Sequence, residues 1–476
     1  MQFTIKPETP IVQQVSNKII AEIIIGRFAA NDKLPSSRAL AEFYGVDKKT
    51  IERVYRKLCA MKWIFAKNRA GSFVCPVQPV LHGSTVQLVV SEVLRTGYPE
   101  SLERLQQLNE KAQSSGGSVY FDDSEVYPCP LLNSRVILSS KKFSSEQYKR
   151  KLDNAAESLF QTVSLLVQQN GFYHKEEELC MMSGENNVLD TINSALIKEG
   201  DVVVMYMPGK TSVYKLFRHR GAEVIPVYGE YESFTGQLAG IAKTRKIKLV
   251  YIEPACQYPT TVSFSKEQKL KLLALAVSYD FMVLEANFDN DFWYDITPFE
   301  SLCLLNRSHV LHLGSVSRLS QHLHTLKYLI GPPKIVEQIK RVWECTGYLD
   351  KVQSRVREEL IMNSMPVTSG VMIRKECRES SEMMAGLISK YLPEFVSFKK
   401  PVAGLGYWLK LKEEQNVHNL YSYLANLGIH IPDPKSYCLP GDNPGGFRLG
   451  FAGLREKTAI TGMEKIATLL KTTSLN

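Results

Sequence analysis

The spacing of apolar and polar positions divides the chain into a short helical N-terminal module and a longer part in which helices alternate with buried strands. Apolar residues recur at helical spacing from 10 to 25, which predicts a first helix. A second helix is expected to begin near Arg38, with Ser36 or Ser37 as its N-terminal cap. The positions of this helix expected to face inward are Ala39, Leu40 and Phe43.

A glycine turn is predicted between the second helix and a third. Gly45 ends the second helix, and Asp47 can cap the next one. The apolar positions of this third helix share one face and are Ile51, Val54, Tyr55 and Leu58. Its first turn and outer face are polar and basic. Two helices joined in this way indicate a helix-turn-helix motif, and the alternative is an ordinary helical hairpin with a solvated basic face.

A two-stranded ribbon is predicted after Trp63. In the run IFAKNRAGSFV, residues 64–74, apolar and polar positions alternate as in paired strands. The tip of this ribbon carries Lys67, Asn68, Arg69 and Gly71. A ribbon with a basic tip suits contact with phosphates or the minor groove. Together with the first helix, the ribbon favours a DNA-binding module over a plain hairpin.

These motifs, in this order, resemble the winged-helix domain of the GntR family of bacterial transcription regulators over residues 8–76. The segments KLPSSRALAEFYGVDKKTIERVYRKL and AGSFV carry the resemblance. It implies DNA contacts from the start of the second helix, the start of the third helix and the wing. The expected DNA-binding residues are Ser37, Arg38, Lys48, Lys49, Thr50, Arg53, Arg69, Gly71 and Ser72. The family's serine-arginine pair is Lys48-Lys49 here, and lysine lacks the bidentate fork of arginine.

The net charge is concentrated in the N-terminal module. Residues 1–78 contain 13 Lys and Arg against 6 Asp and Glu, which is seven of the chain's nine net positive charges. This excess indicates phosphate binding whose affinity depends strongly on salt. The nine scattered cysteines argue against a disulfide framework or a zinc site, so no metal is expected. Without a long apolar run or a signal-peptide layout, the protein is expected to be soluble and cytoplasmic, with no membrane partner.

From about residue 150, short apolar strands alternate with helices, as is typical of a mostly parallel sheet covered on both faces. The expected strands are 202–205, 223–227, 249–253, 281–285, 310–313 and 328–330. The tail has long helices and three further strands, 395–399, 406–411 and 446–451, which suit a smaller α+β domain. The expected organisation is a winged helix over 1–76, a linker over 77–131, a large domain over 132–340 and a small domain over 341–476.

Three segments of this longer part resemble, in order, the fold-type I aminotransferase domain that is fused to GntR modules in the MocR subfamily. MMSGENN, residues 181–187, stands where that family has a Ser-Gly-Ser-Gln-Gln phosphate loop. EPACQYPTT, residues 253–261, stands where it has an HQ-PTG segment. FRLGF contains the carboxylate-binding arginine, Arg448. From the residues alone, a charge in so apolar a strand requires a partner, either a structural ion pair or a substrate carboxylate.

The residues that hold pyridoxal phosphate in that family are replaced here. The Schiff-base lysine motif GTFSK corresponds to GSVSR, which ends at Arg318, and a protonated guanidinium cannot form an imine. The aspartate that pairs with the ring nitrogen corresponds to Ala286, and the tyrosine that contacts the cofactor oxygen to Phe288. The other replaced positions of this degenerate pocket are Glu185, Asn186, Lys210 and Thr325. Glu185 would bring a negative charge to the phosphate.

Three functions follow from these resemblances. The favoured one is a transcription regulator, not an enzyme, with no catalytic residue and no cofactor. Its aminotransferase-like domain would form a homodimer and sense a small carboxylate-bearing effector through Asn287, Arg318 and Arg448, while the winged helix binds a double-stranded DNA operator. The alternatives are a pyridoxal phosphate-dependent regulator, with Lys327 or Lys210 as the amine, and an aminotransferase with an accessory DNA module.

Overall fold

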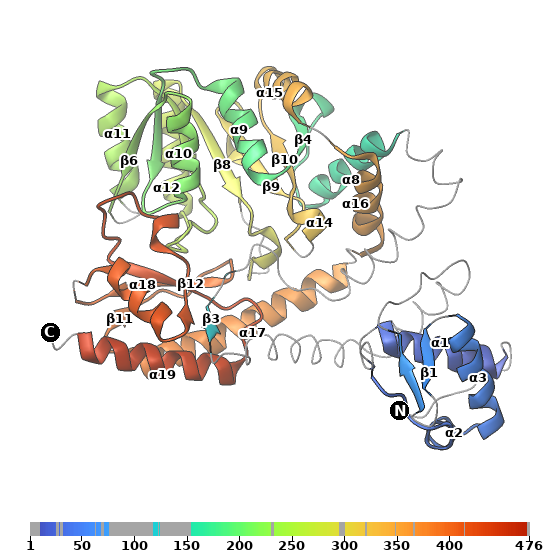
Figure 1. Ribbon diagram of the computed structural model, residues 1–476. Coiled ribbons are helices and arrows are strands. Elements are labelled where there is room, and N and C mark those ends of the chain that lie inside the picture. The colour runs from blue at the N-terminus through green and yellow to red at the C-terminus, as the bar shows by residue number, and fades with distance from the viewer. Residues whose placement is uncertain are drawn as a thin grey trace. The chain divides into compact units, whose positions relative to one another are not determined.

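The computed structural model divides into two compact units. It describes residues 10–24, 28, 32–61, 63–67, 71–75, 118–121, 123, 154–229, 233–294, 300–318, 321–347, 349–364, 367–413 and 415–473. The first unit includes residues 10–75, and the second includes the short stretch around residue 120 and everything described from 154 onward (Figure 1). No helix among the described residues is long and apolar enough to cross a membrane.

The first unit contains three helices and a two-stranded antiparallel ribbon. They are α1 (Ile11–Ile24), α2 (Ser37–Tyr44), α3 (Lys48–Ala60), β1 (Ile64–Lys67) and β2 (Gly71–Val74). The Ser36 side chain caps α2 by accepting a hydrogen bond from the Ala39 amide at 3.2 Å. Gly45 ends α2 in the left-handed conformation, with φ at 66°. Asp47 caps α3 by accepting from the Lys49 amide at 3.0 Å. Two predicted caps and the predicted turn are thereby confirmed.

The core of this unit lies between α1 and α3. The apolar face predicted for the third helix is confirmed, because Ile51, Val54, Tyr55 and Leu58 are all buried. They pack against Val15, Ile19, Ile20 and Ile23 of α1. The predicted inward face of the second helix is wrong at two positions, because Ala39 and Phe43 are exposed. A helix that begins at Ser37 turns positions 40, 41 and 44 toward the core instead.

The second unit is built on a seven-stranded sheet with the order β4-β10-β9-β8-β7-β5-β6. Its strands are β4 (Leu179–Ser183), β5 (Val202–Tyr206), β6 (Glu223–Val227), β7 (Ile247–Ile252), β8 (Met282–Asn287), β9 (Val310–Ser315) and β10 (Leu326–Ile330). Only β10 runs antiparallel to its neighbours. The six predicted strands and the mostly parallel sheet are confirmed. The sequence missed β4, because LCMMS contains no β-branched residue.

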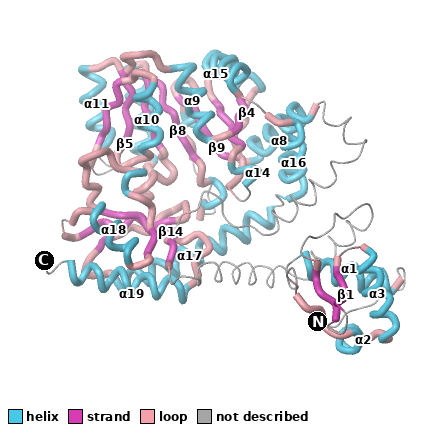
Figure 2. The backbone as a smooth tube through the Cα atoms, in the orientation of Figure 1, coloured by secondary structure: helices cyan, strands magenta, loops and turns pink. Residues whose placement is uncertain are grey.

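Helices cover the sheet, as the cyan segments of Figure 2 show. They are α8 (Ala155–Gln169), α9 (Glu185–Leu196), α10 (Thr211–His219), α11 (Phe234–Thr244), α12 (Lys266–Tyr279), α13 (Leu302–Leu305), α14 (Gln321–His324) and α15 (Pro333–Thr346). A further helix, α16 (Lys351–Ser364), packs mainly against α8. One core cluster joins the inner faces of α9, α10 and α15 to the strands, with Ile192, Phe217 and Ile339 among its fully buried members. This packing fixes the positions of the strand ends, and the side chains of the candidate site follow those ends.

A smaller sheet completes the second unit. Its strands β11 (Val396–Ser397), β12 (Gly406–Leu411) and β14 (Gly446–Gly450) are antiparallel, and its helices are α17 (Val367–Tyr391), α18 (Val417–Asn426) and α19 (Glu456–Thr473). A separate pair joins β3 (Val119–Tyr120) to β13 (Ile429–His430) in parallel. Residues 118–121 therefore belong to this unit, although the sequence placed them in a linker. A two-residue strand is too short to give a periodic signal.

Candidate functional site

The outer face of α3 is exposed and basic. Lys48, Lys49 and Thr50 form its first turn, and Arg53 follows one turn later. The three basic side chains are exposed, and Thr50 is half-buried. The Lys48 ammonium lies 3.1 Å from the Glu52 carboxylate, an exposed i,i+4 pair that contributes little to stability. The N-terminal half of α3 is therefore free of core packing on this side and presents its cations to solvent.

The loop that precedes α2 lies beside α3. Ser37 is the first residue of α2 and is half-buried, and the Arg38 side chain is exposed. The Tyr55 hydroxyl of α3 donates to the Pro35 carbonyl at 2.6 Å, which ties this loop to α3. The first turn of α2 is thereby held at a fixed position relative to α3.

The ribbon has the strand register expected of a wing, with Ile64 opposite Val74 and Lys67 opposite Gly71. The ammonium of Lys67 lies 5.1 Å from the centre of the Phe73 ring, a cation–π contact at the tip. Gly71 has φ at 110°, a conformation that L side chains rarely adopt.

Two of the predicted wing contacts are placed by this ribbon, and one is not. Gly71 is exposed and Ser72 half-buried, and the Ser72 carbonyl accepts from the Leu34 amide at 2.9 Å. Arg69 lies outside the described residues. The wing is therefore joined by its backbone to the segment that precedes α2.

A polar cavity of about 670 Å³ lies in the second unit, where side chains follow the ends of β7, β8 and β9. It brings together the residues predicted for the effector, Asn287, Arg318 and Arg448, and three positions of the degenerate cofactor site, Lys210, Ala286 and Phe288. The side chains of Glu185 and Asn186 lie outside the described residues. Thr325 does not line the cavity.

Arg448 of β14 is a buried cation, with 3% of its surface exposed. Its Nε donates to Oδ2 of Asp123 at 2.7 Å, and its Nη1 donates to the Pro259 carbonyl at 2.8 Å. Burial alone would raise the pKa of Asp123, but the guanidinium groups of Arg448 and Arg318 outweigh it and lower this pKa below its usual value. The sequence allowed either a structural ion pair or a substrate carboxylate as the partner of Arg448. The structure contains the ion pair, with Asp123 as the carboxylate.

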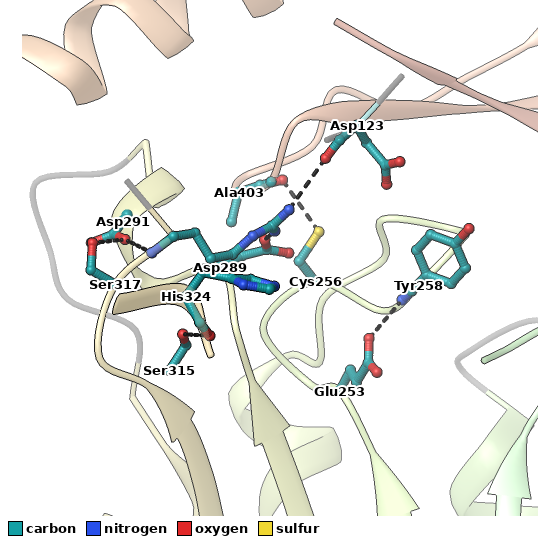
Figure 3. A network of polar contacts seen from close by, with 12 residues as sticks. Asp123, Glu253, Cys256, Tyr258, Asp289, Asp291, Ser315, Ser317, His324 and Ala403 are labelled. Atoms are coloured by element: carbon teal, nitrogen blue, oxygen red, sulfur yellow. Dashed lines mark hydrogen bonds and ion pairs between the residues drawn. The ribbon is translucent and has the colours of Figure 1, made fainter. Parts of the chain in front are cut away.

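Arg318 follows β9 and is also engaged with carboxylates, of which Asp289 and Asp291 are labelled in Figure 3. Its guanidinium is paired with Asp289, and its backbone amide donates to Oδ2 of Asp291 at 2.6 Å. Its Nη2 also donates to the Asp123 carbonyl at 3.2 Å. Burial raises the pKa of Asp291. The Arg318 side chain is therefore held in place by two segments of the chain.

Two lysines point their ammonium groups at one aromatic ring. The Nζ atoms of Lys210 and Lys327 lie 4.6 Å and 4.5 Å from the centre of the Phe288 ring. Lys210 also lies 3.6 Å from the Glu253 carboxylate, and Lys327 donates to the Ser315 hydroxyl at 3.4 Å. Lys327 is in a buried strand, as the sequence indicated, yet its side chain lines the cavity. The sequence signal that could have identified Lys327 as a cavity residue is a lysine near the start of an otherwise apolar strand.

A third arginine, which sequence reasoning missed, approaches the start of α9. Arg357 of α16 is 4% exposed. Its Nη2 donates to the Ser183 hydroxyl at 3.1 Å and to the Thr325 hydroxyl at 3.0 Å. The corner in which the MocR resemblance places a phosphate thus contains a guanidinium supplied by α16. Nothing in the local sequence around Arg357 marks it, because both partners are distant in the chain.

The comparison with known families decides the nature of the first unit. The family model "Bacterial regulatory proteins, gntR family" matches residues 11–74. The first unit contains a GntR domain. Its match covers all the described elements of this unit, from α1 through the wing, and the predicted helix-turn-helix is confirmed with it.

Relatives of known name match the chain well beyond the GntR domain. The probable rhizopine catabolism regulatory protein MocR of Rhizobium meliloti is 21% identical over 96% of this chain and 93% of its own length. The HTH-type transcriptional regulator TauR of Rhodobacter capsulatus is 25% identical over 67% of each chain. The similarity to MocR therefore extends over the GntR domain and the larger second unit together.

Solved structures show the fold of that larger domain. The α-aminoadipate aminotransferase LysN of Thermus thermophilus, complexed with N-(5'-phosphopyridoxyl)-L-leucine, aligns with a TM-score of 0.66 at 17% identity, covering 76% of this chain and 94% of that one. The kynurenine aminotransferase of Pyrococcus horikoshii aligns with a TM-score of 0.66 at 19% identity, over 80% and 98%. The unit that follows the GntR domain is an aminotransferase-like fold, as predicted.

The residues of the cavity do not fit pyridoxal phosphate. Ala286 is buried and has no carboxylate to keep a pyridine nitrogen protonated. Arg318 is not an amine and is paired with Asp289. The Arg357 corner suits an anion, but it lacks the ring partners that would complete the cofactor site. Among the described residues, no group of His, Cys, Asp or Glu is arranged to hold a metal ion.

Proposed function

We propose that this protein is a sequence-specific DNA-binding transcription regulator whose aminotransferase-like domain forms a homodimer and senses a small carboxylate without covalent pyridoxal phosphate. The observation that carries the proposal is the exposed basic start of α3 within a GntR domain. The relatives MocR and TauR are named as regulators, which supports the same role here.

DNA recognition would combine α2, α3 and the wing. Lys48, Lys49, Thr50 and Arg53 would enter the major groove, because the N-terminal end of a recognition helix reads base edges. Ser37 and Arg38 would contact phosphates, and Arg69, Gly71 and Ser72 would contact the backbone or minor groove. Two copies of the GntR domain would read two half-sites through the symmetry of a dimer.

The DNA-binding proposal is tested with the full-length protein. Duplexes selected from a random-sequence pool are titrated by fluorescence anisotropy at several salt concentrations. Lys49→Ala and Arg53→Ala are each expected to weaken binding by about 1–3 kcal/mol and to relax the sequence preference at the contacted base pair, whereas Arg38→Ala should reduce the salt slope by about one. Arg341→Ala serves as the charge-matched control, because Arg341 is an exposed residue of α15 in the other unit. Unchanged binding by both recognition-helix variants would refute the assignment of α3.

The aminotransferase-like domain is proposed to be catalytically inactive. Imine formation requires an unprotonated amine, and the residue at the expected lysine position is Arg318.

A homodimer is tested by sedimentation, and a mass of one chain at micromolar concentration would contradict it.

One observation favours a second candidate, a pyridoxal phosphate-dependent regulator. The amine of Lys327 lines the cavity beside Phe288. The two candidates are separated by incubating the protein with pyridoxal phosphate, reducing it with borohydride and measuring the intact mass. The favoured proposal expects no stoichiometric adduct. An adduct that Lys327→Met abolishes would support the second candidate and exclude the first.

A further inference from the structure

The two arginines nominated for an effector carboxylate already face carboxylates of the same chain. Arg318 is paired with Asp289, its neighbour at the ends of the large sheet. Arg448 is paired with Asp123, which comes from a distant part of the chain and is labelled in Figure 3. Asp123 thus occupies the position at Arg448 where a ligand carboxylate would bind.

We propose that Asp123 is a built-in and displaceable occupant of a carboxylate site at Arg448, and that a small carboxylate ligand binds by taking its place. This inference rests on the proposed ligand-sensing role of the aminotransferase-like domain. In this proposal Asp123 competes with the ligand for Arg448 and so lowers the apparent affinity of the site. Asp123 is also the residue that moves when the ligand binds.

The cation of this pair is held independently of Asp123. Nη1 of Arg448 donates to the Pro259 carbonyl at 2.8 Å, and the guanidinium lies 5.1 Å from the centre of the Tyr258 ring. A Cβ added at Gly406 would lie 2.9 Å from the guanidinium carbon, so the β12 backbone closes its other side. Removal of Asp123 would therefore leave Arg448 preorganised for another carboxylate.

The carboxylate of the pair is less constrained. The side chain of Asp123 is 22% exposed, whereas that of Arg448 is 4% exposed. β3 is anchored by amides of Val119 and Phe121, each donating at 2.7 Å to the segment around β13. Asp123 lies beyond these hydrogen bonds. Its carbonyl accepts from Nη2 of Arg318 at 3.2 Å, so the backbone of Asp123 is held at a second point. The side chain can still rotate away from Arg448 without breaking that hydrogen bond or the pairing of β3 with β13.

The charges of the cavity select an anionic ligand once Asp123 has moved. Its lining cations are Lys210, Arg318, Lys327 and Arg448, and its lining carboxylates are Asp123, Glu253 and Asp289. Withdrawal of Asp123 leaves four cations with two carboxylates. A buried cation without a counter-charge raises the free energy of the fold. An incoming carboxylate therefore restores the ion pair that Arg448 loses when Asp123 moves away. A diamine of similar size would be repelled.

Displacement also supplies a route to regulation. Asp123 belongs to the part of the chain that follows the GntR domain and precedes the large sheet. A ligand that replaces Asp123 at Arg448 breaks one of the two contacts that Asp123 makes with arginines of the cavity, the other being the hydrogen bond from Nη2 of Arg318 to its carbonyl. Ligand binding is thereby coupled to the position of the Asp123 side chain.

The test is a calorimetric titration of the full-length protein with acetate, succinate and glutamate, with putrescine as the diamine control. Asp123→Ala is expected to bind at least one of the carboxylates about tenfold more tightly than the wild type, because an internal competitor reduces apparent affinity. Glu337→Ala, which removes an exposed carboxylate of α15, should match the wild type. Arg448→Gln should abolish carboxylate binding. Asp123→Asn replaces the alanine variant if the latter fails to fold.

Three outcomes would overturn the inference. Equal affinities of wild type and Asp123→Ala would mean that Asp123 does not compete. Binding by the variant alone, with none by the wild type, would make Asp123 a fixed structural partner. If the folded Asp123→Ala variant binds none of the carboxylates, Arg448 does not form a carboxylate site. Because the titration contains no DNA, its result is independent of whether the GntR domain recognises an operator.

Discussion

Replacement of Glu285 by alanine should destabilise the large domain more than any surface change. Glu285 is fully buried in β8, two residues before the cavity residue Asn287. Its carboxylate accepts hydrogen bonds from the Ser301 hydroxyl, from the Leu302 amide at 2.9 Å and from Nδ1 of His312 at 2.9 Å. The single carboxylate therefore joins β8 to β9 and to the start of α13.

The magnitude follows from the groups that lose their acceptor. A buried donor left without a partner costs about 1–3 kcal/mol, and here three donors lose one acceptor. The three costs are not fully additive, because all of them arise from removal of the same carboxylate. We therefore expect Glu285→Ala to lower the free energy of unfolding by about 3–5 kcal/mol. Such a loss is a large fraction of the stability of a typical domain.

The assay is urea unfolding of the full-length protein followed by circular dichroism. The transition of the second unit should move to lower urea, while that of the GntR domain should stay in place. Glu267→Ala is the control, because Glu267 is an exposed residue of α12 whose pair with Lys271 lies at the surface. A midpoint for Glu285→Ala equal to that of the control would refute the reasoning.

Three further predictions concern single residues. Asp47→Ala removes the cap of α3 and should destabilise the GntR domain by about 1 kcal/mol, seen as a lower melting temperature. Gly71→Ala places a side chain at φ 110° and should weaken DNA binding in the anisotropy titration more than Ser72→Ala does. The pKa values of Asp123 and Glu285 are both lowered in the fold. Their stabilisation is complete above about pH 4, the usual pKa range of free carboxyl groups, and acid titration should show it lost as the pH falls through the lowered values. A melting temperature that does not decrease in this range would contradict the last prediction.

The helices of the GntR domain were predictable because their signals are local. The buried face of α3 repeats at helical spacing over thirteen residues, and the caps Ser36 and Asp47 lie beside the helices that they start. The face of α2 was partly misjudged, since eight residues give few repeats and exposed Phe43 resembles a core residue. The strands of the large sheet were likewise readable, except β4 with its methionines.

The contacts that define the cavity were not predictable, because they join residues far apart in the sequence. Asp123 and Arg448 are separated by 325 positions, and Arg357 is 174 positions from Ser183. The sequence could nominate Arg448 because it is a charge in an apolar strand. It could not identify the carboxylate that faces it, since one aspartate in a weakly patterned segment resembles any other.

The number of charges in one cavity argues that the second unit has a role beyond that of a structural scaffold. Arg318 with Asp289, Arg448 with Asp123 and Lys210 with Glu253 form three ion pairs around about 670 Å³ of space. Desolvation makes buried pairs weak contributors to stability, and well-packed apolar side chains of similar volume often stabilise as well or better. A domain that served only as a scaffold would gain from a filled, apolar interior. A cavity lined with paired charges is expected instead where a charged ligand exchanges with one member of a pair.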